Sequence, residues 1–411
     1  MTTDVEVERP RIDLMDPASF VGGHPHEMFA WLRAHDPVHW HEEPGGPGFW
    51  AVTRYDDVKR VSRDASVFSS AQGIMVTEGM RDFGRGSPRM MISMDPPDQL
   101  AYRRLAVPDF VPRAVKAKVP RIAELATRII DGVVDRGECD LVTDVSGMLP
   151  SYVIAELLGI PLEDGVALYD LTEAIHASPE SQEAGAGAVA LGQMLQYAHG
   201  LWESRRSHPT DDLASTLAHA VVDGEPLSEM DFGLYFVLLI DAGGDTVRNL
   251  VATGMLTLLE HPDELDRLRN DVDGRIRTTI EELLRWVSPV TYMRRTATEN
   301  TIIGEREIRA DDKVLMYYGS ANHDPAAFDD PARFDIERWP NDHLAFGAGG
   351  PHFCLGAHLA RAQIEAILRE ILGRLSGLRL AGPPTWLPST FISGVQHLPV
   401  EFEPAPRLSA G

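Results

Sequence analysis

The chain has 411 residues, of which 44% are hydrophobic, and its 38 basic and 62 acidic residues give a net charge of −24. This acidic excess disfavours nucleic acid and anionic membrane as partners, because both carry negative charge. The two cysteines, Cys139 and Cys354, are too few for a disulfide framework. No linker rich in proline, glycine or serine divides the sequence, so we expect one domain over residues 1–411 with an N-terminal tail of about 17 residues.

The sequence carries no targeting or membrane-spanning signal that we identify. The N-terminal segment is charged throughout and lacks the apolar core of a signal peptide. No apolar run approaches the roughly 18 residues that a membrane helix needs. We therefore expect a cytoplasmic protein without a membrane span.

Helical patterns dominate the predicted secondary structure. Two short alternating segments near the N-terminus, at 37–40 and 49–53, predict strands. Apolar residues at helical spacing predict long helices at 114–135, 149–158, 188–207, 229–259, 262–287 and 355–375. Further strands are predicted at 301–308, at 313–318 and as a pair within 391–402. The predicted fold class is mainly α with small β-sheets.

The helix predicted at 229–259 has an unusual middle. It opens on Ser228-Glu-Met-Asp231, a capping pattern, and ends before His261-Pro262. Its centre reads Ala242-Gly-Gly-Asp-Thr246, and two adjacent glycines cost a helix roughly 1 kcal/mol each relative to alanine. The pair predicts the close approach of a flat group or a local opening of the helix. A hinge or a tight helix crossing is the alternative.

A second pattern surrounds Cys354. The sequence Phe346-Gly-Ala-Gly-Gly-Pro-His-Phe-Cys-Leu-Gly356 places one thiol in a glycine-rich turn directly before a predicted helix. Unpaired N–H groups and the positive end of the helix dipole favour the thiolate there, and a thiolate is a soft metal ligand. An inert core cysteine is the alternative reading of the thiol alone.

This stretch resembles the haem-binding loop of the cytochrome P-450 superfamily, with one residue more between Phe346 and Cys354 than the commonest form. The resemblance implies the cytochrome P-450 fold, with haem b (Fe-protoporphyrin IX) between the long central helix and the cysteine loop. Cys354 would be the axial metal ligand. The loop residues implied to contact haem are Phe346, Gly347, Gly349, His352 and Gly356.

The central helix matches the oxygen-activating pattern of the same superfamily. Ala242 and Gly243 would lie against the haem, Thr246 would hydrogen-bond the bound oxygen or its water, and Asp245 would deliver protons from solvent. An ion pair between Asp245 and Arg248 is the alternative for that carboxylate.

Other matches concern haem anchoring and structure. Arg103 stands where the family places a propionate ligand, but Gln99 stands where histidine is common, and an amide carries no charge. Arg295, with Arg294 as its rival, and His352 are further propionate candidates, because guanidinium pairs bidentately with carboxylate. Glu282-Leu-Leu-Arg285 and Arg338 match the family's structural Glu–Arg–Arg cluster, although Glu and Arg three apart are usually a solvated pair.

The resemblance implies a monooxygenase that uses O₂ and two electrons from a ferredoxin and its reductase. The intact Asp245-Thr246 pair favours this enzyme over a haem-thiolate sensor or carrier and over a peroxide-driven oxidase. Six basic residues against one acid between Gln99 and Arg121 suggest a dock for an acidic ferredoxin. A solvated helix face is the alternative.

The substrate is expected to be an apolar small molecule. Flexible methionines between Met75 and Met94, Met80 among them, suit a lid over a bulky guest, although filling of core gaps is their commoner use. The candidate contacts are Met75, Met91, Leu238, Val290, Thr291, Met293, Ile392 and Val395. Several stretches look most like actinobacterial members that oxidise steroid side chains and branched lipids. We therefore expect a steroid, terpenoid or branched-lipid-like substrate, with a polyketide or other natural-product intermediate as the alternative.

Overall fold

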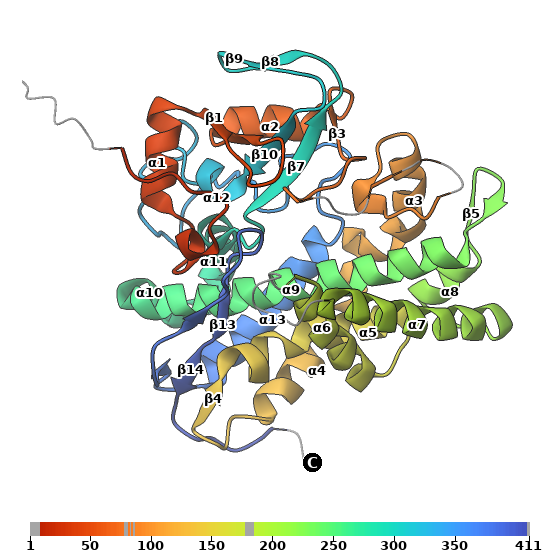
Figure 1. The fold of residues 1–411 in the computed structure, drawn as a ribbon. Helices are drawn as coiled ribbons and strands as arrows, with labels where there is room; N and C mark the ends of the chain where they lie inside the picture. Colours follow the sequence, from red (N-terminus) through yellow and green to blue (C-terminus); the bar gives the residue numbers. More distant parts are fainter. Residues whose placement is uncertain (1–8, 78–80, 83, 85–86, 177–184, 409–411) are drawn as a thin grey trace, which may run out of the picture.

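The long helix α9 (Glu229–Glu260) runs through the middle of the computed structural model, which describes residues 9–77, 81–82, 84, 87–176 and 185–408 (Figure 1). The N-cap Ser228 accepts a hydrogen bond from the backbone N–H of Asp231 at 3.0 Å, as the sequence pattern predicts. Residues 232–240 and 247–258 are all buried. Helix α9 is therefore a central axis of the core, and both halves of it are enclosed by other elements.

The remaining helices are arranged around this axis, and α5, α6, α7, α8, α10, α11 and α13 contact it directly. In chain order they are α1 (His26–His35), α2 (Tyr55–Arg63), α3 (Asp98–Phe110), α4 (Pro112–Asp131), α5 (Met148–Leu158), α6 (Leu162–His176), α7 (Ala186–Ser207), α8 (Leu213–Ala218), α10 (Pro262–Asn270), α11 (Val272–Val287), α12 (Tyr318–Ala321) and α13 (Ala357–Arg374). Short helical turns are η1 (Pro17–Phe20), η2 (Met91–Ser93) and η3 (Leu141–Ser146).

The largest sheet lies on the side of α9 that also carries α1 and α2 (Figure 1). Its strand order is β1-β2-β10-β7-β3, formed by β1 (Val38–His41), β2 (Phe49–Val52), β3 (Phe68–Ser69), β7 (Tyr292–Ala297) and β10 (Lys313–Tyr317). The β2–β10 pair is parallel and the other pairs are antiparallel.

The other strands form smaller sheets. A three-stranded sheet has the order β11-β14-β4, and three two-stranded pairs are β12–β13, β5–β6 and β8–β9. Their bounds are β4 (Glu138–Asp140), β5 (Val221–Val222), β6 (Glu225–Pro226), β8 (Thr301–Ile303), β9 (Arg306–Ile308), β11 (Arg379–Leu380), β12 (Thr385–Trp386), β13 (Val395–His397) and β14 (Pro399–Glu401).

Several predicted elements differ from those observed. The stretch 262–287 is two helices, because the Asp271 side chain caps a new helix start by accepting from Gly274 N at 3.0 Å. The stretch 301–308 is the β8–β9 hairpin rather than one strand. The two strands expected within 391–402 exist as β13 and β14, but they pair with β12 and with β11 and β4.

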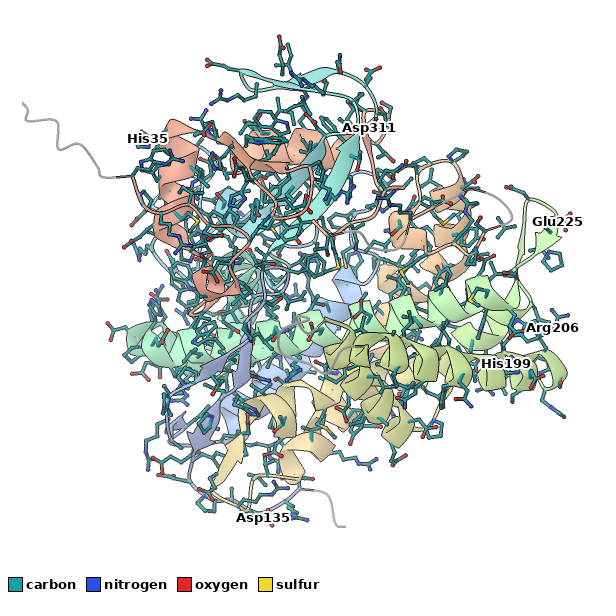
Figure 2. The ribbon with its side chains drawn as sticks, viewed as in Figure 1. His35, Asp135, His199, Arg206, Glu225 and Asp311 are labelled. Atoms are coloured by element: carbon teal, nitrogen blue, oxygen red, sulfur yellow. The ribbon has the colours of Figure 1, made fainter. Side chains whose placement is uncertain are left out.

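Figure 2 labels His35, Glu225 and Asp311 at the rim of the molecule, and all three are exposed. One 18-residue stretch, Leu141–Leu158, is long and apolar enough to cross a membrane by composition, contrary to the expectation that no stretch would be. However, 72% of it is buried inside the fold, which is the behaviour of a core segment.

Candidate active site

The cysteine loop is held in shape by its own backbone. The N–H of Cys354 donates to the carbonyl oxygen of Phe346 at 2.9 Å, and the N–H of Phe353 donates to that of Gly350 at 3.2 Å. Helix α13 begins at Ala357 with Gly356 as its N-cap, two residues later than the sequence predicts. The N–H of Gly356 therefore points at the thiol and hydrogen-bonds it.

Helix α2 supports this loop from behind. Arg63 Nε donates to the carbonyl of Ala348 at 2.8 Å, and Ser62 Oγ donates to that of Gly349 at 3.1 Å. Gly350 has a φ of +83°, and a Cβ on it would lie 2.7 Å from the Ser62 carbonyl oxygen. Both the backbone conformation and the neighbouring α2 backbone therefore require glycine at this position.

Burial raises the pKa of the Cys354 thiol, and this reverses the direction that the helix-dipole argument predicts. The Gly356 N–H and the nearby guanidiniums of Arg103 and Arg361 oppose this effect but do not overcome it. A helix end and two cations are thus insufficient to hold the thiolate by themselves. A directly bound metal cation would supply the missing stabilisation, because coordination deprotonates a thiol outright.

Arg295 is a buried cation that forms no ion pair with a carboxylate of the described residues, although the charge of Asp95 acts on it. Only 4% of the residue is exposed, and its Nη1 donates to the Arg294 carbonyl at 2.8 Å. Burial lowers its pKa, and its charge reaches His352 of the cysteine loop. Among the residues that the structure describes, no carboxylate lies within ion-pair distance of Arg295 or Arg103.

Arg294 and Arg295, the two alternative propionate ligands, point to opposite faces of β7. Neighbouring strand residues point to opposite faces. Arg294 donates to the Met75 carbonyl at 3.3 Å and to Thr296 Oγ1 at 3.1 Å, whereas Arg295 lies near His352. Arg295 is therefore the arginine on the side of the cysteine loop.

Helix α3 and the cysteine loop meet through two of the predicted residues. Gln99 Nε2 donates to the Pro351 carbonyl at 3.0 Å, and Arg103 Nη2 donates to the Phe353 carbonyl at 2.7 Å. The Gln99 side-chain oxygen is buried and has no partner. Gln99 thus fastens α3 to the loop, and Arg103 places a cation beside it.

His352 is a neutral residue whose ring has two hydrogen-bonding partners. Its Nε2 lies 3.2 Å from Ser70 Oγ, and the ring also hydrogen-bonds the Met94 backbone. Burial, aided by the charge of Arg295, lowers the pKa of His352 to about 3. Because it is neutral and already bonded, His352 is a weaker anchor for a carboxylate than Arg103 or Arg295.

These residues fit a haem group. A thiol at the end of a glycine-rich turn suits axial ligation of iron. Two guanidiniums without carboxylate partners, one of them buried, suit the two propionates of haem, since an unpaired buried charge is costly. The donor set is therefore complete for an anionic porphyrin with a thiolate ligand.

The middle of α9 is exposed on one side although the helix is buried before and after it. Ala242 is exposed, and Thr246 Oγ1 donates to its carbonyl at 3.3 Å. The helix is unbroken over residues 229–260, so the local opening that the glycine pair suggests is absent. Ala242 and Thr246, one turn apart, therefore share an accessible face at the helix centre.

The glycine pair serves helix crossing, the alternative reading of the sequence. A Cβ on Gly243 would lie 3.3 Å from Ile154 of α5, and one on Gly244 would overlap the ring of Tyr169 from α6. The flat group beside Gly244 is thus a tyrosine. The structure places Gly243 against α5, and its assignment to the cofactor stays a prediction.

Asp245 belongs to a polar network with α6. The Tyr169 hydroxyl donates to Asp245 Oδ1 at 3.0 Å and accepts from Arg248 Nη1 at 2.6 Å. Arg248 lies 4.0 Å from the same carboxylate oxygen, so the ion pair considered as an alternative is present. Asn249 Nδ2 also donates to the Asp245 backbone carbonyl at 2.9 Å. Sequence reasoning did not identify Tyr169, and its only signal was the lack of a side chain at Gly244.

The structure brings the predicted Glu–Arg–Arg cluster together. Glu282 and Arg285 are fully buried and form a bidentate pair at 2.7 and 2.8 Å, and Arg338 Nε lies 3.2 Å from Glu282. Arg285 also donates to the carbonyls of Asn322 and Pro331, at 2.9 and 3.0 Å. The alternative of a solvated surface pair is excluded by this burial.

The candidate substrate contacts fall into two groups. Met75, Val290, Met293 and Ile392 pack in one hydrophobic cluster beside the large sheet. Met91, Leu238 and Val395 belong to the cluster around α9. Thr291 follows Val290 in the sequence and is fully buried. Its hydroxyl has no hydrogen-bond partner among the described residues. Met80 lies outside the described residues.

Comparison with known proteins identifies the family. The cytochrome P450 family model matches residues 193–379. The chain is 35% identical over 403 residues to the steroid C26-monooxygenase of Rhodococcus jostii (strain RHA1), which covers 96% of this chain and 85% of that protein. It is 37% identical over 393 residues to the methyl-branched lipid omega-hydroxylase of Mycobacterium tuberculosis (strain ATCC 25618 / H37Rv), covering 91% and 90% of the two chains.

The fold agrees with solved structures of the same family. A Mycobacterium marinum cytochrome P450 in complex with pseudoionone is 36% identical and superimposes with a TM-score of 0.89, covering 96% of this chain and 99% of that one. Relatives at this identity extend over nearly the whole length of both chains. The chain therefore belongs to the cytochrome P450 family of haem-binding monooxygenases.

Proposed function

We propose that this P450 hydroxylates a steroid, terpenoid or branched-lipid-like molecule near the end of an alkyl chain. The observation that carries the haem chemistry is the Cys354 thiol in its turn beside Arg103 and Arg295, two cations without carboxylate partners. The substrate class rests on the names of two relatives, a steroid C26-monooxygenase and a methyl-branched lipid omega-hydroxylase. Both names describe oxidation of apolar molecules.

Each residue near the cysteine loop has a distinct role in this proposal. Cys354 would ligate the iron, and Arg103 and Arg295 would bind the haem propionates. When bound, haem supplies the iron at which O₂ is activated for insertion of one oxygen atom into a C–H bond, and thiolate ligation favours O–O cleavage. The remaining loop residues Phe346, Gly347, Gly349, His352 and Gly356 keep the turn in shape, and Gln99 ties it to α3.

Proton supply is assigned to the middle of α9. The Thr246 hydroxyl lies on the accessible face of the helix beside Ala242 and donates a proton there. Asp245, one residue earlier, exchanges protons with solvent through the network that contains Tyr169 and Arg248. A haem sensor or carrier would have no use for this acid–alcohol pair.

The substrate is expected to lie between the two hydrophobic groups described above. Met75, Val290, Met293 and Ile392 would line one side, and Met91, Leu238 and Val395 the other. Their side chains are apolar, which suits a hydrocarbon chain or ring system. The Thr291 hydroxyl, buried without a partner, is the one polar group among these candidates that could bind a substrate oxygen.

Electrons are proposed to come from a ferredoxin and its reductase. Arg104, Arg113 and Lys116 on α3 and α4 are exposed cations that suit an acidic partner. Arg121 contributes less, because Glu124 and Glu156 pair with it at 2.9 and 2.7 Å. The whole chain is proposed to act as one cytoplasmic domain.

Three measurements test this proposal. The reduced, carbon-monoxide-treated protein should show the red-shifted Soret band of thiolate-ligated haem, and Cys354→Ser should abolish it. A spectral titration with steroids, terpenes, branched fatty acids and macrolides should then identify ligands that displace the iron-bound water. With ferredoxin, reductase and NAD(P)H, the best ligand should yield an alcohol at its chain end. Absence of the thiolate-type spectrum would refute the haem assignment, and turnover of macrolides alone would refute the substrate class.

A further inference from the structure

Glu281, next to the buried Glu282 on α11, belongs to a different network that reaches the cysteine loop. We propose that Arg361, held by Glu281 and His343, is a positioning residue that fixes the loop around Cys354 and sets the reduction potential of the haem. This inference rests on the proposed haem ligation by Cys354. It goes beyond that proposal by assigning a function to three residues outside the motifs identified from the sequence.

The Glu281–Arg361 pair has the geometry of a rigid clamp. Arg361 Nε and Nη2 donate to the two oxygens of Glu281 at 2.6 and 2.7 Å. Such a bidentate pair fixes the guanidinium plane as well as its position. Burial alone would raise the pKa of Glu281, but the hydrogen bonds from Arg361 and His343 outweigh it and lower the pKa to about 2. Glu281 is therefore an anion at neutral pH.

His343 completes the clamp as a hydrogen-bond partner. Its Nε2 lies 2.9 Å from Glu281 Oε2, and the backbone N–H of Ala345 lies 3.2 Å from its Nδ1. The clamp therefore joins one guanidinium and one imidazole to a single carboxylate.

Arg361 contacts both ends of the turn that carries the thiol. Its guanidinium carbon lies 4.5 Å from the centre of the Phe346 ring, a cation–π contact. Its Nη1 donates to the Ala357 carbonyl at 3.2 Å, in the first turn of α13. Phe346 in turn accepts the hydrogen bond from the Cys354 N–H at 2.9 Å. One side chain thus spans the loop from residue 346 to residue 357, with the thiol between.

The charges of this clamp act on the sulfur. The guanidinium of Arg361 lies against both ends of the turn that carries the thiol, at the Phe346 ring and at the Ala357 carbonyl. Reduction of ferric to ferrous haem adds one electron from the external donor and makes the site more negative. A cation beside the thiolate therefore raises the reduction potential, and an anion lowers it. In the intact clamp, Glu281 balances Arg361.

Replacing Arg361 or Glu281 should therefore shift the reduction potential of the haem in opposite directions. Arg361→Met leaves the Glu281 anion unbalanced and should lower the equilibrium constant for one-electron reduction about tenfold, which corresponds to about 59 mV. Glu281→Gln leaves the Arg361 cation unbalanced and should raise this equilibrium constant by a similar factor. The double variant removes both charges and should return close to the parent value.

The experiment is a spectroelectrochemical titration of the haem-loaded proteins, with haem retention measured in parallel. Arg369→Met is the matched control, because Arg369 lies on the same helix two turns away and pairs with Asp273 and Glu365 at 2.7 and 3.0 Å. It should leave the potential unchanged. Arg361→Lys keeps the charge but not the planar fork, and should loosen haem with a smaller shift in potential.

The possible outcomes separate cleanly. Opposite shifts for the single variants and near-cancellation in the double variant support the inference. Equal potentials in all variants, or shifts of the same sign, overturn it, because a purely structural clamp would give those results. If Arg361→Met does not retain haem, the near-isosteric Glu281→Gln still tests the inference, because its reduction potential must rise. A parent protein without the thiolate-type spectrum would refute the proposed function itself, which is a distinct result.

Discussion

The Tyr169 hydroxyl donates a hydrogen bond to Asp245 at 3.0 Å, and so a residue of α6 fixes the carboxylate proposed to relay protons on α9. The same hydroxyl accepts from Arg248 at 2.6 Å, and the guanidinium of Arg248 lies 5.5 Å from the ring centre. The position of Asp245 therefore depends on the packing of α6 against α9. That packing depends in turn on the absence of a side chain at Gly244.

Replacing Tyr169 with phenylalanine should disturb proton delivery but leave haem binding intact. The ring remains to fill its place beside Gly244, whereas the hydrogen bonds to Asp245 and Arg248 are lost. We expect product formation to fall about tenfold, which is less than the roughly 10²–10⁴-fold contribution of a general acid or base, because Tyr169 only positions Asp245. The rate should also become more sensitive to D₂O. An unchanged solvent isotope effect and unchanged rate would show that Asp245 acts without Tyr169.

Thr246→Ala should uncouple electron consumption from product formation. Without the hydroxyl, the proton donor on the accessible face of α9 is missing, so reducing equivalents should be diverted to hydrogen peroxide. The ratio of peroxide to product should rise about tenfold or more, while NAD(P)H consumption continues. Thr246→Ser keeps the hydroxyl and is the control. A Thr246→Ala protein that couples as well as the parent would exclude the proposed role of Thr246.

Gly244→Ala should destabilise the protein through a steric clash with Tyr169. Overpacking of a buried helix contact costs roughly 1–3 kcal/mol of unfolding free energy. The matched control is Gly192→Ala on α7, where a Cβ would meet nothing within 4 Å. That control should stabilise its helix by up to about 1 kcal/mol. Urea unfolding of both variants measures the difference, and equal stabilities would contradict the close crossing of α6 and α9.

Arg295→Met should have opposite effects on the haem-free and haem-loaded proteins. Removing a buried cation that has no carboxylate partner should stabilise the haem-free protein by on the order of 1 kcal/mol. The same change removes a propionate ligand, so the haem dissociation rate should rise about tenfold. Arg294→Met, on the opposite face of β7, should leave haem dissociation unchanged. If Arg294→Met loosens haem and Arg295→Met does not, the assignment of the two arginines is reversed.

The protein should lose stability as the pH falls from 7 towards 5. Burial holds the pKa values of His24 and His323 below the ordinary value near 6.5. The unfolded chain therefore binds protons below about pH 6.5 that the folded chain does not, and acidification favours unfolding. Each such histidine contributes up to about 1.4 kcal/mol per pH unit.

His323→Gln tests the origin of this slope. Glutamine does not bind a proton in this pH range. The unfolding free energy should therefore fall less steeply between pH 7 and 5, by up to about 1.4 kcal/mol per pH unit. His208→Gln is the control, because His208 is an exposed residue at the C-terminal end of α7. A slope that does not change in His323→Gln would assign the acid sensitivity to other groups.

The motifs in the sequence were enough to predict the family, the mainly helical fold and the haem-dependent monooxygenase class, and the comparisons confirm all three. The reason is that a cysteine turn and a helix centre are local patterns with fixed spacing. Strand β7 was missed, since Arg294 and Arg295 interrupt its apolar alternation even though both are buried. Buried charges of this kind depend on tertiary partners, which a sequence pattern does not contain.

The roles of Gly244 and of the Cys354 thiol also depend on tertiary partners that the sequence pattern does not contain. A glycine pair in a helix indicates that something approaches closely, but not that it is the Tyr169 ring. The helix-dipole argument gave the wrong direction for the pKa of Cys354, because the cost of burying the thiolate outweighs it. Glu281, His343 and Arg361 escaped notice because they are far apart in sequence and belong to no common motif.

The contact of Ser62 and Arg63 with residues 348–350 matters to anyone who redesigns this enzyme. The end of α2 thus helps to fix the conformation of the turn that carries Cys354, although the two segments are distant along the chain. Saturation libraries that aim at new products should therefore leave positions 62, 63 and 350 untouched.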